Sequence, residues 1–223
     1  SKEKKLLTCF LSSFDELLLA GLVNSNSIYN QSNSLDYLAK IVRNRIGWEF
    51  VIRAHPNMLT RPKSEQRYWT EYLKNIEALV VGPGDDVDTY QLIQVSDLIL
   101  TFGSTVGVEA IAMGKPSIII GKALYSGFNL PIEIGDPKEI DHYLDNLPRV
   151  TSESLEQLKI YCYFQLYGGI RFKYLKVKQS DLYKFNPTLY YKGKKAFSTD
   201  LGMKIFSKLL YFFQNPLPKE IKE

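Results

Sequence analysis

The sequence predicts an α/β fold, a doubly wound parallel sheet of the Rossmann-like type followed by a helical C-terminal annex. Short apolar segments alternate with segments of helical periodicity over residues 5–147. Most apolar segments end in glycine, proline or serine, the residues of turns. Hydrophobic residues make up 45% of the 223 residues, enough for one sizeable core. We predict a Rossmann-like domain over 1–147 and a helical annex over 148–223 that packs on it.

Six short segments are predicted to be strands. They are bounded by charged residues or turn formers, as buried strands are, and span 5–11, 48–53, 76–81, 97–102, 116–120 and 132–134. Cys9 lies within the first apolar run and is expected in the core.

Helices are predicted between and after these strands. Leu35, Leu38, Ile41, Val42 and Ile46 recur at helical spacing, so we expect a helix there with Asn33 or Ser34 as its N-cap. The other predicted helices are 66–74, a short one capped by Asp88, one from Val106 that stops at Gly114, one from Pro137 to Leu144, 152–167 and 200–213.

Composition narrows the class of protein. The net charge of +4 is mild and dispersed; it does not call for nucleic acid but suits a nucleotide diphosphate or a peripheral contact with an anionic membrane. The two cysteines form no CxxC pair and have no histidine cluster, which favours a reducing cytoplasm and no zinc site. There is no apolar run of membrane-spanning length. The chain begins with Ser and soon reaches a strand, so we expect it to be part of a longer protein.

Small, hydroxylic and basic residues follow several predicted strands. Ligands of open parallel sheets bind beyond the carboxyl ends of the strands, so these residues should share one edge. The residues concerned are Ser12 and Ser13 after the first strand, Arg53 and His55 at the second, and Gly103, Ser104 and Thr105 after the fourth. The sequence therefore predicts an anion site at this edge.

The segment FGSTVGVEA carries the strongest local signal. Ser104 and Thr105 stand where a helix begins, and free backbone N–H groups there favour a phosphate. Gly103 and Gly107 would let the ligand approach, and Glu109 could accept hydrogen bonds from a ribose. The competing interpretation is that Ser104 only caps the helix and Glu109 is solvated.

Other polar residues have two interpretations each. His55 can donate to a phosphate or be an incidental loop residue, whereas His142 is expected on the surface. Asp15 and Glu16 could bring a carboxylate to the cleft or belong to a first helical turn. Asp85, Asp86 and Asp88 fit a turn and an N-cap better than a metal site, and we predict neither metal nor cofactor.

Three motifs occur in an order that resembles a known family. FLSSFDE, VIRAHPN and SDLILTFGSTVGVEAIAMGKPSIIIG are similar to the C-terminal half of bacterial capsule polysaccharide biosynthesis proteins, GT-B glycosyltransferases that include Kdo transferases. The resemblance covers roughly residues 5–130. It implies that this chain is the donor-binding half of a transferase, inactive alone, whose catalytic base comes from a missing N-terminal domain.

The resemblance also implies roles for residues. His55, Ser104 and Thr105 would hold the phosphate of a nucleotide-sugar donor such as CMP-Kdo, with His55 as clamp or proton donor. Glu109 would bind the ribose, and Ser12 and Ser13 would line the inter-domain cleft. The acceptor would be a glycan or glycolipid, and the location the cytoplasm or the inner face of the plasma membrane.

Alternatives remain open within and outside the enzyme class. The donor could be CDP-glycerol or a UDP-sugar, and a UDP-sugar epimerase shares the layout. A non-catalytic nucleotide-binding module would also carry these motifs. A flavodoxin-like regulatory domain is disfavoured, because its site would need acidic residues at the strand ends.

Overall fold

A computed structural model describes residues 4–13, 28–167, 175–176, 188–191 and 194–195. The chain divides into two compact units, Ser1–Tyr167 and Gly168–Glu223. The first unit carries the large sheet. The domain boundary predicted after residue 147 stays a prediction, and the helix that follows it belongs to the first unit.

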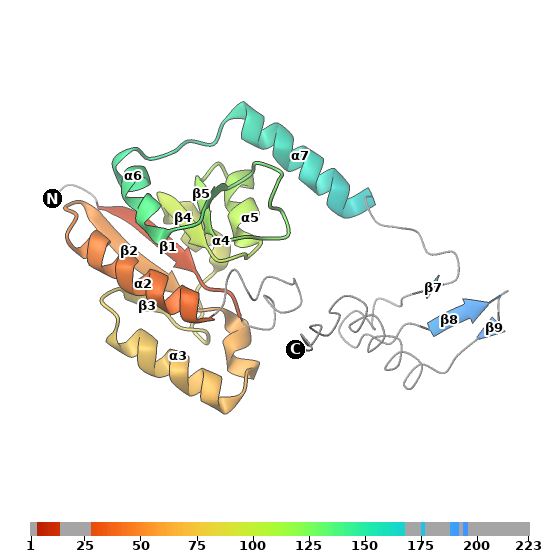
Figure 1. Cartoon of the computed structure of the whole chain (residues 1–223), viewed down its shortest axis with the longest axis horizontal. Coiled ribbons are helices and arrows are strands. Elements are labelled where there is room, and N and C mark those ends of the chain that lie inside the picture. The colour runs from red at the N-terminus through yellow and green to blue at the C-terminus, as the bar shows by residue number, and fades with distance from the viewer. Residues whose placement is uncertain (1–3, 14–27, 168–174, 177–187, 192–193, 196–223) are drawn as a thin grey trace, which may run out of the picture. The chain divides into compact units, whose positions relative to one another are not determined.

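The sheet has six strands that all run parallel, in the order β3-β2-β1-β4-β5-β6 (Figure 1). This order confirms the doubly wound, Rossmann-like fold class, because it reverses direction between β1 and β4. The strands are β1 Lys5–Phe10, β2 Trp48–Arg53, β3 Leu79–Val81, β4 Leu98–Thr101, β5 Ser117–Ile120 and β6 Ile132–Ile134. The third strand is shorter than predicted and begins at Leu79.

Helices cover both faces of this sheet. One face packs against α2 (Ile28–Arg43), α3 (Lys63–Asn75) and α6 (Ile140–Asp145) through the largest hydrophobic cluster. The other face packs against α4 (Thr89–Val95), α5 (Val106–Ala112) and α7 (Ser152–Tyr167) through two smaller clusters. The sheet is thus buried between two helical layers.

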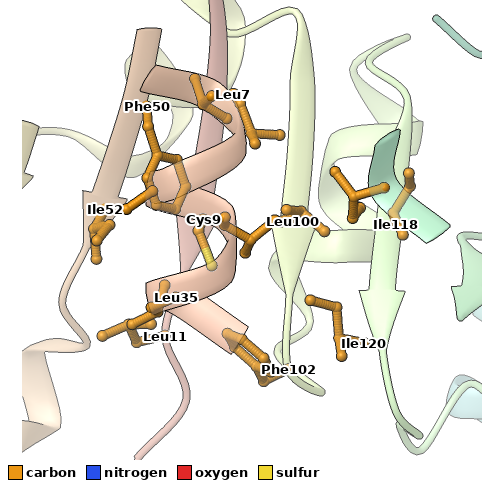
Figure 2. Packing of buried hydrophobic residues seen from close by; sticks show 14 of the residues in the cluster. Leu7, Cys9, Leu11, Leu35, Phe50, Ile52, Leu100, Phe102, Ile118 and Ile120 are labelled. Carbon is orange, nitrogen blue, oxygen red and sulfur yellow. The ribbon is translucent and has the colours of Figure 1, made fainter. Parts of the chain in front are cut away.

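The two-residue period of a strand assigns side chains to these layers. Leu7 and Cys9 of β1 and Leu11 just after it lie in the large cluster, whereas Phe10 lies in a cluster on the opposite face. Figure 2 shows Cys9 between Phe50 and Leu100, side chains of the two neighbouring strands. The expectation that Cys9 is a core residue is confirmed.

Helix α2 differs from its prediction at both ends. It begins at Ile28, before the predicted caps Asn33 and Ser34, and ends at Arg43. Ile46 lies beyond the helix and is fully exposed, so its place in the predicted apolar stripe was wrong. The stripe instead extends toward the N-terminus through Gln31, a fully buried polar residue.

The described part of the annex includes more than helix. Helix α7 spans Ser152–Tyr167 as predicted, and three short antiparallel strands follow: β7 Leu175–Lys176, β8 Thr188–Tyr191 and β9 Lys194–Lys195. The predicted helix over 200–213 lies outside the described residues. Within the described residues, no helix is both long and apolar enough to cross a membrane.

Candidate nucleotide site at the carboxyl edge of the sheet

Strand register places the predicted site residues at one level of the sheet. Phe10 pairs with Arg53 of β2 on one side and with Thr101 of β4 on the other. Two residues beyond these three paired positions, the chain reaches Ser12, His55 and Gly103, which therefore lie at the same edge of the sheet. Strands are about 4.8 Å apart, so His55 and Gly103 lie roughly 10 Å from each other across the β1 terminus.

This edge is also where the winding of the sheet reverses. Helix α2, which follows β1, packs on one face of the sheet, and α5, which follows β4, packs on the opposite face. In open α/β sheets, ligands bind at such a reversal, beyond the carboxyl ends of the strands. Residues 12–13 and 103–105 follow the two strands at this reversal.

Ser12 and Ser13 are both about 1% exposed, yet neither hydroxyl has a hydrogen-bond partner among the described residues. A buried hydroxyl without a partner costs free energy. Two such groups in succession at a strand end therefore mark a place where a polar ligand would be stabilised.

Gln31 of α2 fixes the backbone beneath these hydroxyls. Its side-chain carbonyl accepts from the Ser12 N–H at 3.1 Å, and its amide donates to the Ser12 carbonyl at 3.2 Å. The sequence interpretation did not single out Gln31, because a polar residue just before an apolar stripe resembles a cap or loop residue. Its spacing from Leu35, Leu38 and Val42, at i, i+4, i+7 and i+11, was the available signal.

Arg53 is buried at the end of β2, and its guanidinium donates to the carbonyl of Gly82, just beyond β3. The side chain therefore joins two neighbouring strand ends. Its Nε has no hydrogen-bond partner in the described part of the chain. A role in anion binding stays a prediction, with that one N–H group as the possible donor.

His55 caps the short 3-10 helix η1 (Pro56–Thr60), and its Nδ1 accepts from the Asn57 N–H at 3.1 Å. Because Nδ1 accepts, the proton of a neutral imidazole resides on Nε2. The local fold thus selects the tautomer that presents Nε2–H as a donor. A contact between His55 and a phosphate stays a prediction.

The Gly103–Thr105 loop connects β4 to α5. Gly103 has φ +114°, a conformation that side chains disfavour, which allows the sharp exit from the strand. The Ser104 hydroxyl accepts from the Val106 N–H at 3.3 Å, and the Thr105 hydroxyl donates to Glu109 at 2.9 Å. Capping and ligand binding are compatible for Ser104, whose hydroxyl hydrogen remains available for donation.

Gly107 has a different role from the one predicted. A Cβ atom there would lie 2.7 Å from the Tyr125 hydroxyl and 3.2 Å from that of Ser117. The glycine therefore allows α5 to approach the sheet and Tyr125; it does not open a path for ligand. Tyr125 was not identified from the sequence, and it donates to the Ser104 carbonyl at 2.6 Å.

The remaining polar candidates have local partners or lie elsewhere. Asp85 accepts from the Gly82 N–H and Asp88 caps α4, which confirms the turn and N-cap interpretation. His142 is exposed on α6, as expected. Asp15 and Glu16 lie outside the described residues. Within the described residues, no group of three or more His, Cys, Asp or Glu side chains could hold a metal ion.

Comparison with known proteins finds a family model that matches part of this chain. Residues 25–134 match the model of the family described as capsule polysaccharide biosynthesis protein. The match includes the ends of β2 and β4 and therefore His55 and the Gly103–Thr105 loop. No curated protein sequence matches the chain.

Solved structures resemble this chain at low sequence identity. The beta Kdo 2,4 transferase of KpsC from Thermosulfurimonas dismutans is 18% identical with a TM-score of 0.45, covering 71% of this chain and 44% of its own. An E. coli structure described as trehalose-6-phosphate bound with UDP-2-fluoro glucose is 11% identical with a TM-score of 0.51, covering 76% and 45%. This chain therefore spans less than half the length of either structure.

Proposed function

We propose that this chain, whose residues 25–134 match the capsule polysaccharide biosynthesis protein family, belongs to that family and binds the nucleotide-activated sugar of a glycosyltransferase. The chain would be the donor-binding half of an enzyme that builds surface polysaccharide. A glycan or glycolipid would be the acceptor, and a preceding domain would complete the cleft. The location we propose is the cytoplasm, including the inner face of the plasma membrane.

The polar residues at the neighbouring ends of β1 and β4, where the winding of the sheet reverses, are the observation that carries this proposal. On one side lie two buried hydroxyls, Ser12 and Ser13, that have no partner among the described residues. On the other side lies the Gly103–Thr105 loop, with hydroxyls on two successive residues. Hydrogen-bond donors that converge on one strand edge suit the phosphate oxygens of a nucleotide.

The chemistry proposed for this site is electrostatic. As the sugar leaves its nucleotide, negative charge builds on the phosphate oxygen that held it. The Nε2–H of His55 and the hydroxyls of Ser104 and Thr105 would donate to this phosphate and stabilise the developing charge. Transfer of a proton from His55 to the leaving group would require the imidazolium form, which loses the hydrogen bond that Nδ1 accepts from the Asn57 N–H. No base for the acceptor is assigned, because the proposal places it in the preceding domain.

The Glu109 carboxylate is the proposed contact for the ribose. It lies one helical turn beyond Thr105 and accepts one hydrogen bond from that residue, which leaves further acceptor positions on its two oxygens. A carboxylate that accepts from two adjacent ribose hydroxyls would recognise the nucleoside independently of the sugar. The base and the sugar would then determine which donor is used.

Calorimetric titration with CMP, CDP and UDP would test the proposal. We expect a cytidine nucleotide to bind best, in keeping with a CMP-Kdo donor, and Ser104→Ala to weaken it about tenfold, the effect of losing a hydrogen bond to a charged group. Preference for CDP would favour a CDP-glycerol donor, and preference for UDP a UDP-sugar. Binding of none of the three would contradict a donor site formed by this chain alone.

A non-catalytic nucleotide-binding module is the second candidate, because the same buried hydroxyls would bind a nucleotide without any sugar transfer. The two functions separate in a longer protein that includes the preceding domain. Sugar transfer that is lost in His55→Ala would establish the enzyme. Retained nucleotide binding without any transfer would establish the binding module.

A further inference from the structure

Tyr125 lies in the connection between β5 and β6 and packs beneath the Gly103–Thr105 loop. Its hydroxyl donates to the Ser104 carbonyl at 2.6 Å and lies 3.5 Å from the hydroxyl of Thr101, the last residue of β4. Tyr125 is about 1% exposed. The position of Tyr125 is therefore determined by the core, whereas the carbonyl that it binds belongs to the loop that follows β4.

The surrounding residues are small or hydroxylic where the Tyr125 hydroxyl sits. A Cβ atom at position 107 would lie only 2.7 Å from the Tyr125 hydroxyl oxygen, so Gly107 leaves room for this hydroxyl. The aromatic ring of Tyr125 contacts that of Tyr161 edge to face, with the ring centroids 6.1 Å apart. Burial raises the pKa of Tyr125 well above its usual value, so the hydroxyl remains a donor at physiological pH. The packing thus maintains one buried phenol as a donor to one loop carbonyl.

We propose that Tyr125 is a positioning residue for the nucleotide phosphate, acting through the Ser104 carbonyl. This inference rests on the function proposed above. The Ser104 carbonyl accepts two hydrogen bonds, one from the Tyr125 hydroxyl and one from the Gly107 N–H at 3.2 Å. Because a peptide group is planar, two hydrogen bonds to its carbonyl fix the orientation of the whole Ser104–Thr105 linkage. The hydroxyls of both residues then project from a fixed backbone.

The hydrogen bond from Tyr125 would affect nucleotide affinity by fixing the conformation of the Gly103–Thr105 loop before the ligand binds. Gly103 lets the chain turn sharply at φ +114°, and a glycine also leaves the loop with more conformations to lose when a ligand binds. A hydrogen bond that selects one conformation beforehand lowers this entropic cost. Tyr125 would therefore change nucleotide affinity without touching the nucleotide.

Tyr125→Phe is the first test, because it removes the hydroxyl and keeps the ring. We expect nucleotide affinity to fall roughly fivefold, the factor that corresponds to one net hydrogen bond. The amide NMR signals of Ser104 and Thr105 in the ligand-free protein should shift, and their hydrogen exchange should accelerate. Tyr161→Phe is the matched control: it removes a hydroxyl from the same cluster, one with no hydrogen bond to the described loop, and should leave both measurements unchanged.

Gly107→Ala, alone and combined with Tyr125→Phe, distinguishes a positioning role of Tyr125 from a purely structural one. The added methyl group displaces the Tyr125 hydroxyl, so both the melting temperature and the affinity should fall. Adding Tyr125→Phe removes the clashing oxygen and should restore much of the melting temperature. Affinity should stay as low as in Tyr125→Phe alone, because the carbonyl still lacks its donor. Recovery of affinity together with stability would overturn the proposal.

Different results would refute the nucleotide-binding function and the positioning role of Tyr125. Wild-type protein that binds none of the nucleotides, but whose Ser104 and Thr105 signals shift in Tyr125→Phe, would refute the nucleotide function and with it the phosphate role of Tyr125. Wild-type protein that binds a nucleotide with the same affinity as Tyr125→Phe would refute the positioning role alone.

Discussion

The side-chain amide of Gln31 forms two hydrogen bonds with the backbone of a single residue, Ser12, one accepted and one donated. An amide side chain offers the same donor and acceptor pair as a peptide group. Gln31 therefore provides, from helix α2, the backbone partner that a strand would supply. It holds the backbone that follows β1 at the carboxyl edge of the sheet.

Gln31→Leu should destabilise the fold, because it leaves a buried N–H and a buried carbonyl unpaired. The expected cost is about 1–3 kcal/mol for each unpaired group, measured by urea denaturation. Gln31→Glu should also destabilise, since a carboxylate cannot donate to the Ser12 carbonyl. Asn33→Ala, at an exposed position of the same helix, is the control and should change stability by less than about 0.5 kcal/mol. Equal effects of Gln31→Leu and the control would show that the amide contributes nothing.

The double variant Ser12→Ala/Ser13→Ala should bind nucleotide more weakly while folding at least as stably as wild type. Alanine removes two buried hydroxyls that have no described partner and preserves the backbone contacts with Gln31. Relief of each unpaired hydroxyl is worth up to about 1 kcal/mol. Thermal unfolding and calorimetric titration would be measured together. A large loss of stability would mean that these hydroxyls serve the fold, not a ligand.

His55→Asn should separate the capping role of His55 from its proposed contact with phosphate. Asparagine is a preferred N-cap and can replace Nδ1 as the acceptor for the Asn57 N–H. It lacks the Nε2–H donor, so nucleotide affinity should fall nearly as far as in His55→Ala. His55→Ala should in addition cost about 1 kcal/mol of stability by loss of the cap. Wild-type affinity in His55→Asn would remove His55 from the site.

Glu133 should contribute stability that depends on pH. Burial acts to raise the pKa of Glu133, but hydrogen bonds from Lys122 and Ser126 outweigh it and lower the pKa. A carboxyl group whose pKa is lower in the folded state stabilises the fold above its unfolded pKa, and the contribution disappears as the pH falls through the folded value.

Glu133→Gln should therefore be less stable than wild type at neutral pH by about 0.2–1 kcal/mol, the range for a partly exposed ion pair. The difference should shrink as the solution is acidified to about pH 3, below the usual range for glutamate. Denaturation at both pH values measures it. A difference that stays constant with pH would exclude the ionised form as its source.

The two cysteines should react with thiol reagents at very different rates. Cys9 is fully buried, and burial raises the pKa of its thiol far above the usual value, whereas Cys162 is exposed. Since the thiolate is the reactive species, the native protein should release one equivalent of chromophore from a disulfide reagent and the denatured protein two. Cys162→Ser should abolish the native reaction. Rapid reaction of both thiols in the native state would contradict the burial of β1.

Local pattern was sufficient to locate most elements of the fold. Apolar runs such as 48–53 identified strands because both faces of a parallel sheet are buried, and helix α7 was predicted with its observed bounds. The prediction failed where a polar residue belongs to the core. Gln31 is buried because its side chain binds the backbone of Ser12, 19 residues away in the sequence. The spacing of apolar residues cannot predict such a contact.

The sequence by itself determined which residues meet at the carboxyl edge, because the ends of parallel strands share one edge whatever their order. It therefore predicted that Ser12, His55 and the Gly103–Thr105 loop share this edge. Only the tertiary structure decided the strand order that puts the reversal between β1 and β4, and the burial of Arg53 against Gly82. It alone placed Tyr125 beneath Ser104, 21 residues away in the sequence, because a contact between separate elements follows from packing and leaves no local pattern.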